Sequence, residues 1–365
     1  MQSRSGKEKG EERCGASVET DDEAWAGCKA TLRVAQRDSG SLAPASSRDT
    51  CDAHEPNFGH RGATRSSHLL PKIDLGDKGM KSLENFSEGL LEMTTLAGPL
   101  LLVGCGKMGA ALLRGWIDHG LAKNEVIVVE PQAAARQLIR AELGVEIVAE
   151  ASDIASDFRC RAGVFAVKPQ MMADVLPHYV ERMTKETLVI SIAAGTSVER
   201  FEEAFGKETP IVRAMPNTPA AIAQGVTALF ANRHADQDQQ RLAEALMAAV
   251  GNVHWIDDEA LMHPITAMSG GGPAYVFLLI ETLAQAGIAN GLPEDLAWPM
   301  ARSTVIGSGA LAAASDETAA MLRKNVTSPA GTTEAALRVL MAADGIQPLF
   351  DQAISAATRR SEELA

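Results

Sequence analysis

Residues 100–109 read LLLVGCGKMG. An apolar run that ends in glycine is typical of a buried parallel strand, and the glycines that follow have the GxGxxG spacing. In this pattern Gly104 permits a tight turn, Gly106 lets the backbone approach a pyrophosphate, and Gly109 lets the next helix pack closely against the strand. The N-terminus of that helix offers free N–H groups and a positive dipole end to the phosphates. The stretch therefore predicts a strand, a dinucleotide-binding turn and a helix, with a purely structural glycine turn as the alternative.

Further apolar runs follow, and helical stretches separate them. The predicted strands span 125–130, 163–167, 188–192 and 211–215. Strands that alternate with helices are typical of an α/β fold with a doubly wound parallel sheet. We therefore expect a Rossmann-type dinucleotide-binding domain over residues 98–256.

The pattern changes after about Asp257, where the strands end and Ala-rich helical segments begin. These segments span 273–290, 293–314, 331–343 and 346–364. An all-α region with small faces and few aromatic residues often completes its core with a partner subunit. We expect residues 257–365 to form such a helical dimerisation domain.

Residues 1–79 differ in composition from the rest of the chain. Only ten of them are Val, Ile, Leu, Phe or Trp, and no helical or strand period persists. Such a segment cannot bury enough apolar surface to offset its loss of conformational entropy. We predict a disordered extension over residues 1–97. A further hypothesis takes Met80 as the native start, which N-terminal peptide mapping of the protein from its own cells would test.

Composition argues against several classes of protein. The formal net charge of −13 argues against nucleic acid and anionic membranes as partners, because both favour basic surfaces. No apolar run approaches 18 residues, so we expect no transmembrane helix and no membrane partner. The five cysteines form no CxxC pair, and no cluster of metal ligands is visible, so we predict neither a disulfide framework nor a metal site. No secretory signal is visible, and a cytoplasmic location is the expectation.

An acidic residue, Glu130, ends the second predicted strand. An acid at this place usually accepts hydrogen bonds from the adenosine ribose, which favours NAD over NADP. Arg136 follows about one helical turn later and could relieve the repulsion between Glu130 and a 2′-phosphate. The alternative is that Glu130 only caps the strand. The choice between NADH and NADPH therefore stays open.

Two further segments lie at the carboxyl ends of predicted strands, where ligands bind in a doubly wound sheet. Lys168 follows the strand at 163–167, and Asn217 lies in the loop RAMPNTP at 213–219, which two prolines stiffen. An asparagine amide offers donors and an acceptor, which suit the carboxamide of nicotinamide. The competing interpretations are a solvated lysine and a stiff connection.

Two glycine-containing segments open helices in the C-terminal region. The segment SGGGPAY at 269–275 has an anion-accepting shape, or else is a domain hinge. The segment SPAGTTE at 328–334 presents Thr332 and Thr333 in a first helical turn, where hydroxyls and free N–H groups suit a small carboxylate. An ordinary N-cap is an equal alternative, because threonine favours that position.

These motifs, in this order, resemble those of the pyrroline-5-carboxylate reductases. The resemblance covers about residues 100–364 and is carried by VGCGKMG, AVKP, RAMPNTP, SGGGPAY and NVTSPAGTTEAAL. It implies reduction of 1-pyrroline-5-carboxylate to L-proline with NADPH or NADH, the last step of proline biosynthesis, by direct hydride transfer to the C=N carbon. It also implies a Rossmann domain, a helical dimerisation domain, and interlocked homodimers that often assemble into decamers.

The resemblance also assigns roles to individual residues. It implies that the substrate loop reaches the site from the second subunit, binds the carboxylate through backbone N–H groups, and brings the Thr333 hydroxyl to the ring nitrogen as the catalytic group. The implied cofactor-binding residues are Val103, Gly104, Cys105, Gly106, Lys107, Met108, Gly109, Glu130, Ala166, Val167, Lys168, Pro169, Ile192, Ala193, Ala194 and Asn217. The implied substrate-binding residues are Asp316, Ser328, Pro329, Ala330, Gly331, Thr332 and Thr333.

Two positions depart from the family pattern, and two other functions stay in competition. Gly271 stands where the family has serine, and Ala330 where it has glycine, so a positive φ at Ala330 would be strained. A β-hydroxyacid dehydrogenase shares the glycine turn but relies on a lysine in its helical domain, and Lys324 lacks the surrounding motif. A catalytically silent NAD(P)-binding sensor would have lost the substrate loop, which the two adjacent threonines argue against.

Overall fold

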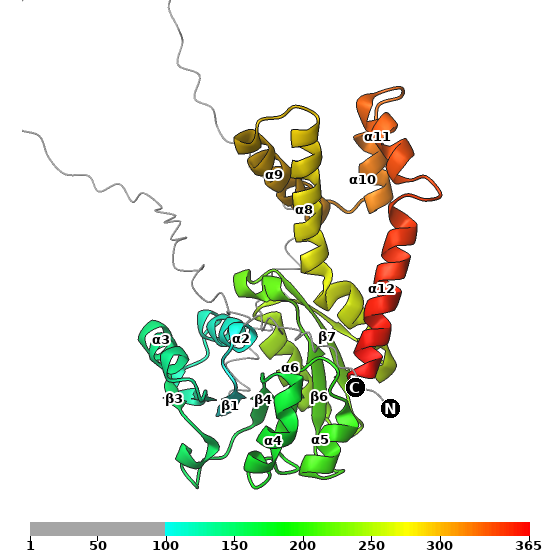
Figure 1. The fold of residues 1–365 in the computed structure, drawn as a ribbon. Coiled ribbons are helices and arrows are strands. Elements are labelled where there is room, and N and C mark those ends of the chain that lie inside the picture. Colours follow the sequence, from blue (N-terminus) through cyan, green and yellow to red (C-terminus); the bar gives the residue numbers. More distant parts are fainter. Residues whose placement is uncertain (1–98) are drawn as a thin grey trace, which may run out of the picture. The chain divides into compact units, whose positions relative to one another are not determined.

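The computed structural model describes residues 99–365, and Figure 1 shows their fold. The expected extension over residues 1–97 and the hypothesis about Met80 concern residues outside this range. Strands of the described residues form one sheet in the order β3-β2-β1-β4-β5-β6-β7-β8. The bounds are β1 Leu100–Val103, β2 Val126–Val129, β3 Glu146–Val148, β4 Ala162–Phe165, β5 Leu188–Ser191, β6 Ile211–Met215, β7 Gly225–Ala231 and β8 Gly251–Trp255.

The sheet confirms the Rossmann-type fold class, with one correction. Neighbouring strands run parallel, except that β6 and β7 pair antiparallel. The connection after β6 is short and turns back at Ala223, whose φ of 54° lies in the left-handed region. The chain therefore returns beside β6 instead of crossing over through a helix, which a parallel pair would require.

Helices cover both faces of this sheet. The helices are α2 Lys107–Asp118, α3 Ala133–Leu143, α4 Met172–Val175, α5 Val198–Phe205 and α6 Gln237–Ala248. Apolar residues of α2, α3 and α6 share one buried cluster with one face of the sheet, and those of α4 and α5 share another with the opposite face. Trp116 of α2 is fully buried in the first cluster and donates its indole N–H to the carbonyl of Leu246, with 2.7 Å between the two atoms.

The rest of the described chain is helical. It comprises α7 Met262–Ile265, a π-helix Thr266–Gly270, α8 Gly272–Ala289, α9 Glu294–Ala313, α10 Ala319–Asn325, α11 Thr332–Leu340 and α12 Ile346–Glu363. Helices α8 and α9 pack against each other as a hairpin, and α12 returns to contact α7 and the π-helix (Figure 1). In the described chain α8 buries only Pro273 and Ala284, although its 18 residues are mostly apolar.

The α8 and α9 pair exposes a large apolar surface. In α8 the exposed side chains include Phe277 and Leu278, which are 59% and 60% exposed. The helical run Glu259–Ala289 is also long and apolar enough to cross a membrane, judged by length and composition alone. Length and composition alone do not show that a helix crosses a membrane, so the expectation of no transmembrane helix stays a prediction.

Candidate active site

The three glycines of the turn after β1 differ in what surrounds them. Gly104 has a φ of +87°, and a Cβ there would lie 2.7 Å from Val167 Cγ1 and 2.9 Å from the carbonyl oxygen of Ala166. A Cβ on Gly109 would collide with the carbonyl oxygen of Gly104, whereas one on Gly106 would meet nothing within 4 Å. The fold itself therefore requires glycine at positions 104 and 109. The space beside Gly106 is open, which fits the approach of a pyrophosphate.

A pocket of about 540 Å³ opens at the carboxyl ends of β1, β2 and β4. It brings together seven of the sequence-predicted cofactor residues, namely Val103, Gly104, Gly106, Glu130, Ala166, Val167 and Lys168. The nine that do not line it are Cys105, Lys107, Met108, Gly109, Pro169, Ile192, Ala193, Ala194 and Asn217. Its lining also includes residues that sequence reasoning missed, among them Glu150, Ser152 and His178. Recognising β3 would have flagged Glu150 and Ser152, since they follow that strand's carboxyl end.

The carboxylate of Glu130 is held by two backbone N–H groups. Cys105 N donates to Oε2 and Gln132 N donates to Oε1, each with 2.9 Å between the atoms. Glu130 is only 6% exposed, yet it lines the pocket. Arg136 donates through Nη1 to the backbone carbonyl oxygens of Glu130 and Pro131, at 2.9 and 2.6 Å. Glu130 therefore joins the glycine turn to the loop after β2.

Cys105 also contributes a buried free thiol, which feels the charge of this carboxylate. Burial raises its pKa to about 12, with a smaller contribution from the negative charge of Glu130. Thiolates are the reactive form of cysteine, so Cys105 is an unreactive neutral thiol at physiological pH. Its place in the site comes from its backbone N–H, which holds Glu130.

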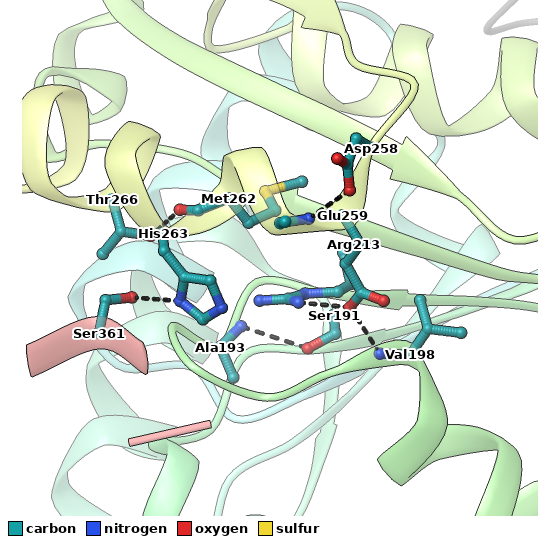
Figure 2. Close-up of polar contacts among 11 residues, drawn as sticks. Ser191, Ala193, Val198, Arg213, Asp258, Glu259, Met262, His263, Thr266 and Ser361 are labelled. Carbon is teal, nitrogen blue, oxygen red and sulfur yellow. Dashed lines mark hydrogen bonds and ion pairs between the residues drawn. The ribbon is translucent and has the colours of Figure 1, made fainter. Parts of the chain in front are cut away.

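Glu259, in the first helical turn of the C-terminal part, contacts both β6 and the start of α5 (Figure 2). Arg213 of β6, whose side chain is 6% exposed, pairs with Glu259. The Oε1 atom of Glu259 also accepts from Val198 N at the start of α5, at 2.8 Å. Figure 2 also shows His263 sharing a hydrogen bond with Ser361 of α12, with 3.0 Å between Nδ1 and Oγ. The start of α5, which follows the loop that contains Ile192, Ala193 and Ala194, is thus tied to the C-terminal part of the chain.

Asn217 connects the loop after β6 to the π-helix. Its Oδ1 accepts from Val226 N at 2.9 Å, and its Nδ2 donates to the carbonyl of Ser269 at 3.3 Å. The amide is 9% exposed and keeps one further N–H for another partner. The nearby glycine motif also has a geometric reason, because a Cβ on Gly271 would lie 2.5 Å from the hydroxyl oxygen of Tyr275. A serine at this position would therefore require the tip of the tyrosine side chain to move.

The predicted substrate loop leads into α11. Ala330 has a φ of 58°, so the strain expected for this departure from glycine is confirmed. Glu334 accepts a hydrogen bond from Ala330 N, and Gly331 N donates to the carbonyl of Ser328 at 3.0 Å. Gly331 is the N-cap of α11, and no side chain caps this end of the helix. The alternative that a threonine acts as the N-cap is therefore wrong, and the exposed Thr332 and Thr333 occupy the first helical turn.

The two halves of the predicted site do not share one pocket within a single chain. The residues that line the pocket at the glycine turn end at Tyr179, whereas the substrate loop begins at Ser328. Asp316 lies in the connection between α9 and α10 and is exposed, as Ser328, Pro329 and Ala330 are. Among residues 99–365, no group of three His, Cys, Asp or Glu residues is placed to hold a metal ion.

Comparisons with known proteins place the chain in a family. Residues 259–364 match the family model for pyrroline-5-carboxylate reductase dimerisation, and residues 100–195 match the model described as NADP oxidoreductase coenzyme F420-dependent. The chain is 38% identical to the pyrroline-5-carboxylate reductase of Pseudomonas aeruginosa over 266 residues, which cover 73% of this chain and 96% of that protein. It is 39% identical to the Synechocystis enzyme of the same name over 264 residues, with coverages of 72% and 97%.

Solved structures give the same result. A pyrroline-5-carboxylate reductase from Coxiella burnetii superposes with a TM-score of 0.69 at 36% identity, covering 74% of this chain and 99% of that one. The pyrroline carboxylate reductase of Plasmodium falciparum, solved with NADP bound, gives a TM-score of 0.63 at 29% identity, with coverages of 73% and 97%. Since relatives above 30% identity are matched over nearly their whole length, the chain belongs to the pyrroline-5-carboxylate reductase family.

Proposed function

We propose that this chain reduces 1-pyrroline-5-carboxylate to L-proline with NAD(P)H, the last step of proline biosynthesis. The observation that carries the proposal is the match to reductases of this name over almost their full length, at 38% and 39% identity. The open space beside Gly106 and the pocket at the strand ends support dinucleotide binding independently of that match.

The cofactor-binding residues divide into those that shape the site and those that face the pocket. Gly104 and Gly109 shape the turn, and Gly106 admits the pyrophosphate to the N-terminus of α2, whose free N–H groups suit its charge. Glu130 lies at the ribose end, and Lys168 lines the pocket after β4. The segment Ile192–Ala194 and Asn217 complete the nicotinamide end in this proposal.

The reaction needs little from the protein beyond orientation and one hydrogen-bonding group at the ring nitrogen. The bound dinucleotide supplies a hydride from C4 of its nicotinamide to the C5 carbon of the pyrroline C=N bond. The protonated imine is the better electrophile, and the hydroxyl of Thr333 binds the ring nitrogen. The backbone N–H groups at the N-terminus of α11 bind the substrate carboxylate, together with Ser328 and Thr332. Most of the acceleration then comes from holding donor and acceptor in a reactive geometry.

The assembly proposed for the enzyme is a homodimer, with a decamer as its larger form. The exposed apolar face of α8 and α9 supports this, because such a surface is normally covered in a soluble protein. In the dimer the loop at 328–333 reaches the cofactor pocket of the other subunit. Residues 98–256 then form the dinucleotide domain, and residues 257–365 form the dimerisation and substrate domain. A dimer interface also gives the apolar run of α8 a role without a membrane, and the enzyme works in the cytoplasm.

The test is a turnover assay. Purified protein is mixed with 1-pyrroline-5-carboxylate, and loss of reduced-nicotinamide absorbance is followed with NADH and with NADPH. Turnover establishes the reductase. Dinucleotide binding without turnover would contradict it and favour a silent sensor, and turnover only with β-hydroxyacids would favour that dehydrogenase class.

A further inference from the structure

Building on the proposed function, we propose that the ribose end of the pocket selects NADH over NADPH, and that Glu130 determines this choice. The two cofactors differ by one phosphate on the 2′-oxygen of the adenosine ribose. A site that accepts this phosphate must offer a cation or free N–H donors around it. The described structure uses the nearest such groups for other contacts.

The donors closest to the carboxylate are already bonded. The N–H groups of Cys105 and Gln132 belong to the two loops that flank the ribose position, and both donate to Glu130. A 2′-phosphate beside Glu130 would find these donors occupied. A ribose hydroxyl has the opposite requirement, because it donates a proton and each carboxylate oxygen keeps a lone pair to accept it.

The cation closest to Glu130 in sequence bonds to the backbone and does not line the pocket. Arg136 donates through Nη1 to the carbonyl oxygens of Glu130 and Pro131, and it is not among the residues that line the pocket. Lys168 lines the pocket but follows β4, two strands from β2 in the sheet order. On the side of β2 and β3 the charged lining residues are acids, Glu130 and Glu150.

Charge then decides between the cofactors. A 2′-phosphate carries nearly two negative charges at neutral pH, and at this position it would face a buried carboxylate that two hydrogen bonds fix in place. Like charges a few ångströms apart in a partly buried site repel strongly enough to lower affinity about tenfold or more. NADH lacks this charge and gains the hydrogen bond from its 2′-hydroxyl.

The experiment measures binding separately from turnover. Isothermal titration gives the dissociation constants of ADP-ribose and 2′-phospho-ADP-ribose, neither of which can donate a hydride. The proteins are the unmodified chain, Glu130→Gln, and the control Glu146→Gln. Glu146 is an exposed acid on neighbouring β3 that does not line the pocket, so its substitution makes the same change in net charge.

We expect the unmodified chain to bind ADP-ribose at least about tenfold more tightly than the 2′-phosphorylated ligand. Glu130→Gln should reduce this ratio about tenfold, and Glu146→Gln should leave it within about twofold. Equal or tighter binding of the 2′-phosphorylated ligand by the unmodified chain would overturn the proposal, as would an unchanged ratio in Glu130→Gln. A preference for 2′-phospho-ADP-ribose in a protein that still turns over 1-pyrroline-5-carboxylate would leave the reductase assignment intact. Binding of neither ligand would overturn both.

Discussion

At the scale of single residues, the glycine turn contains one glycine that serves ligand binding, Gly106, and another that the fold requires, Gly109. Gly106 has open space around its missing Cβ, and its φ of −66° suits any residue. Gly106→Ala should therefore change the free energy of unfolding by less than about 0.5 kcal/mol while weakening NADH binding at least about tenfold. Gly109→Ala is the contrast, because its Cβ meets the backbone of Gly104 and should destabilise the fold by about 1–3 kcal/mol. Urea denaturation and NADH fluorescence titration measure the two effects, and normal NADH affinity in Gly106→Ala would contradict the assignment.

Thr333 is the residue to which the proposed chemistry assigns a hydroxyl. It makes no side-chain cap at the α11 N-terminus, and it is exposed in the single chain. Removing a hydrogen bond to a charged ring nitrogen in the transition state costs about 1.5–3 kcal/mol, so Thr333→Ala should lower kcat/KM about 10- to 100-fold. Thr333→Ser keeps the hydroxyl and should recover most of the activity. Steady-state kinetics with an unfolding midpoint for each variant tests this, and unchanged kcat/KM in Thr333→Ala would refute the role.

Ala330 adopts a backbone conformation that glycine adopts freely. A left-handed φ costs an L-residue about 1–2 kcal/mol, while a glycine loses more conformational entropy on folding. Ala330→Gly should therefore stabilise the protein by a net amount of about 0.5–1 kcal/mol. Ala335→Gly, inside the regular turns of α11, should instead destabilise it by about 1 kcal/mol. Calorimetric midpoints that fall for both variants would show that the left-handed alanine is not strained.

At the scale of secondary structure elements, the exposed face of α8 carries the proposed dimer. Leu278 on this helix is 60% exposed in the single chain, and a carboxylate buried at that place in an interface would be strongly unfavourable. Leu278→Asp should therefore weaken association by more than about 2 kcal/mol and reduce turnover in parallel. Leu138→Asp on α3 is the matched control, since Leu138 is 65% exposed outside the region matched by the dimerisation model. Light scattering after size exclusion measures the assembly, and a native-sized Leu278→Asp protein would exclude this face.

The elements that the sequence predicted share a physical cause. Strands β1, β2 and β4 are buried at every position, so they appear as unbroken apolar runs. Strand β3 has only three residues and begins with an exposed glutamate, and β8 alternates partly buried with exposed positions at the sheet edge, so neither stands out. The same difference in strand burial limited how much of the candidate site could be predicted from the sequence. The glycine turn and Glu130 follow conspicuous strands, whereas Glu150 follows β3 and could be placed only by the fold.

At the scale of the whole molecule, the two predicted half-sites lie apart in the single chain. This allows a test of whether one site takes its cofactor pocket and its substrate loop from different subunits. Gly106→Ala should impair the cofactor half and Thr333→Ala the substrate half, so each variant alone should keep at most about a tenth of the activity when NADH and substrate are both limiting. If the substrate loop acts on the pocket of the other subunit, random mixing on co-expression leaves roughly a quarter of the sites with both halves intact. If each chain completed its own site, no mixed assembly would contain an intact one, and activity would stay at the level of the single variants.

A second mixture distinguishes the same two arrangements, but here sites formed within one chain would give the higher activity. A chain that carries both substitutions, co-expressed equally with the unmodified chain, should also give roughly a quarter of full activity when sites form between subunits. Sites formed within one chain would give roughly half, because every unmodified chain would then remain competent. The two mixtures should have the same activity only if each site is built from two subunits. Differences in expression or stability between the variants would change the activity of one mixture without the other. Equal activities therefore locate Thr333 at the pocket of the neighbouring subunit, as the exposed substrate loop and the uncovered α8 face both lead us to expect.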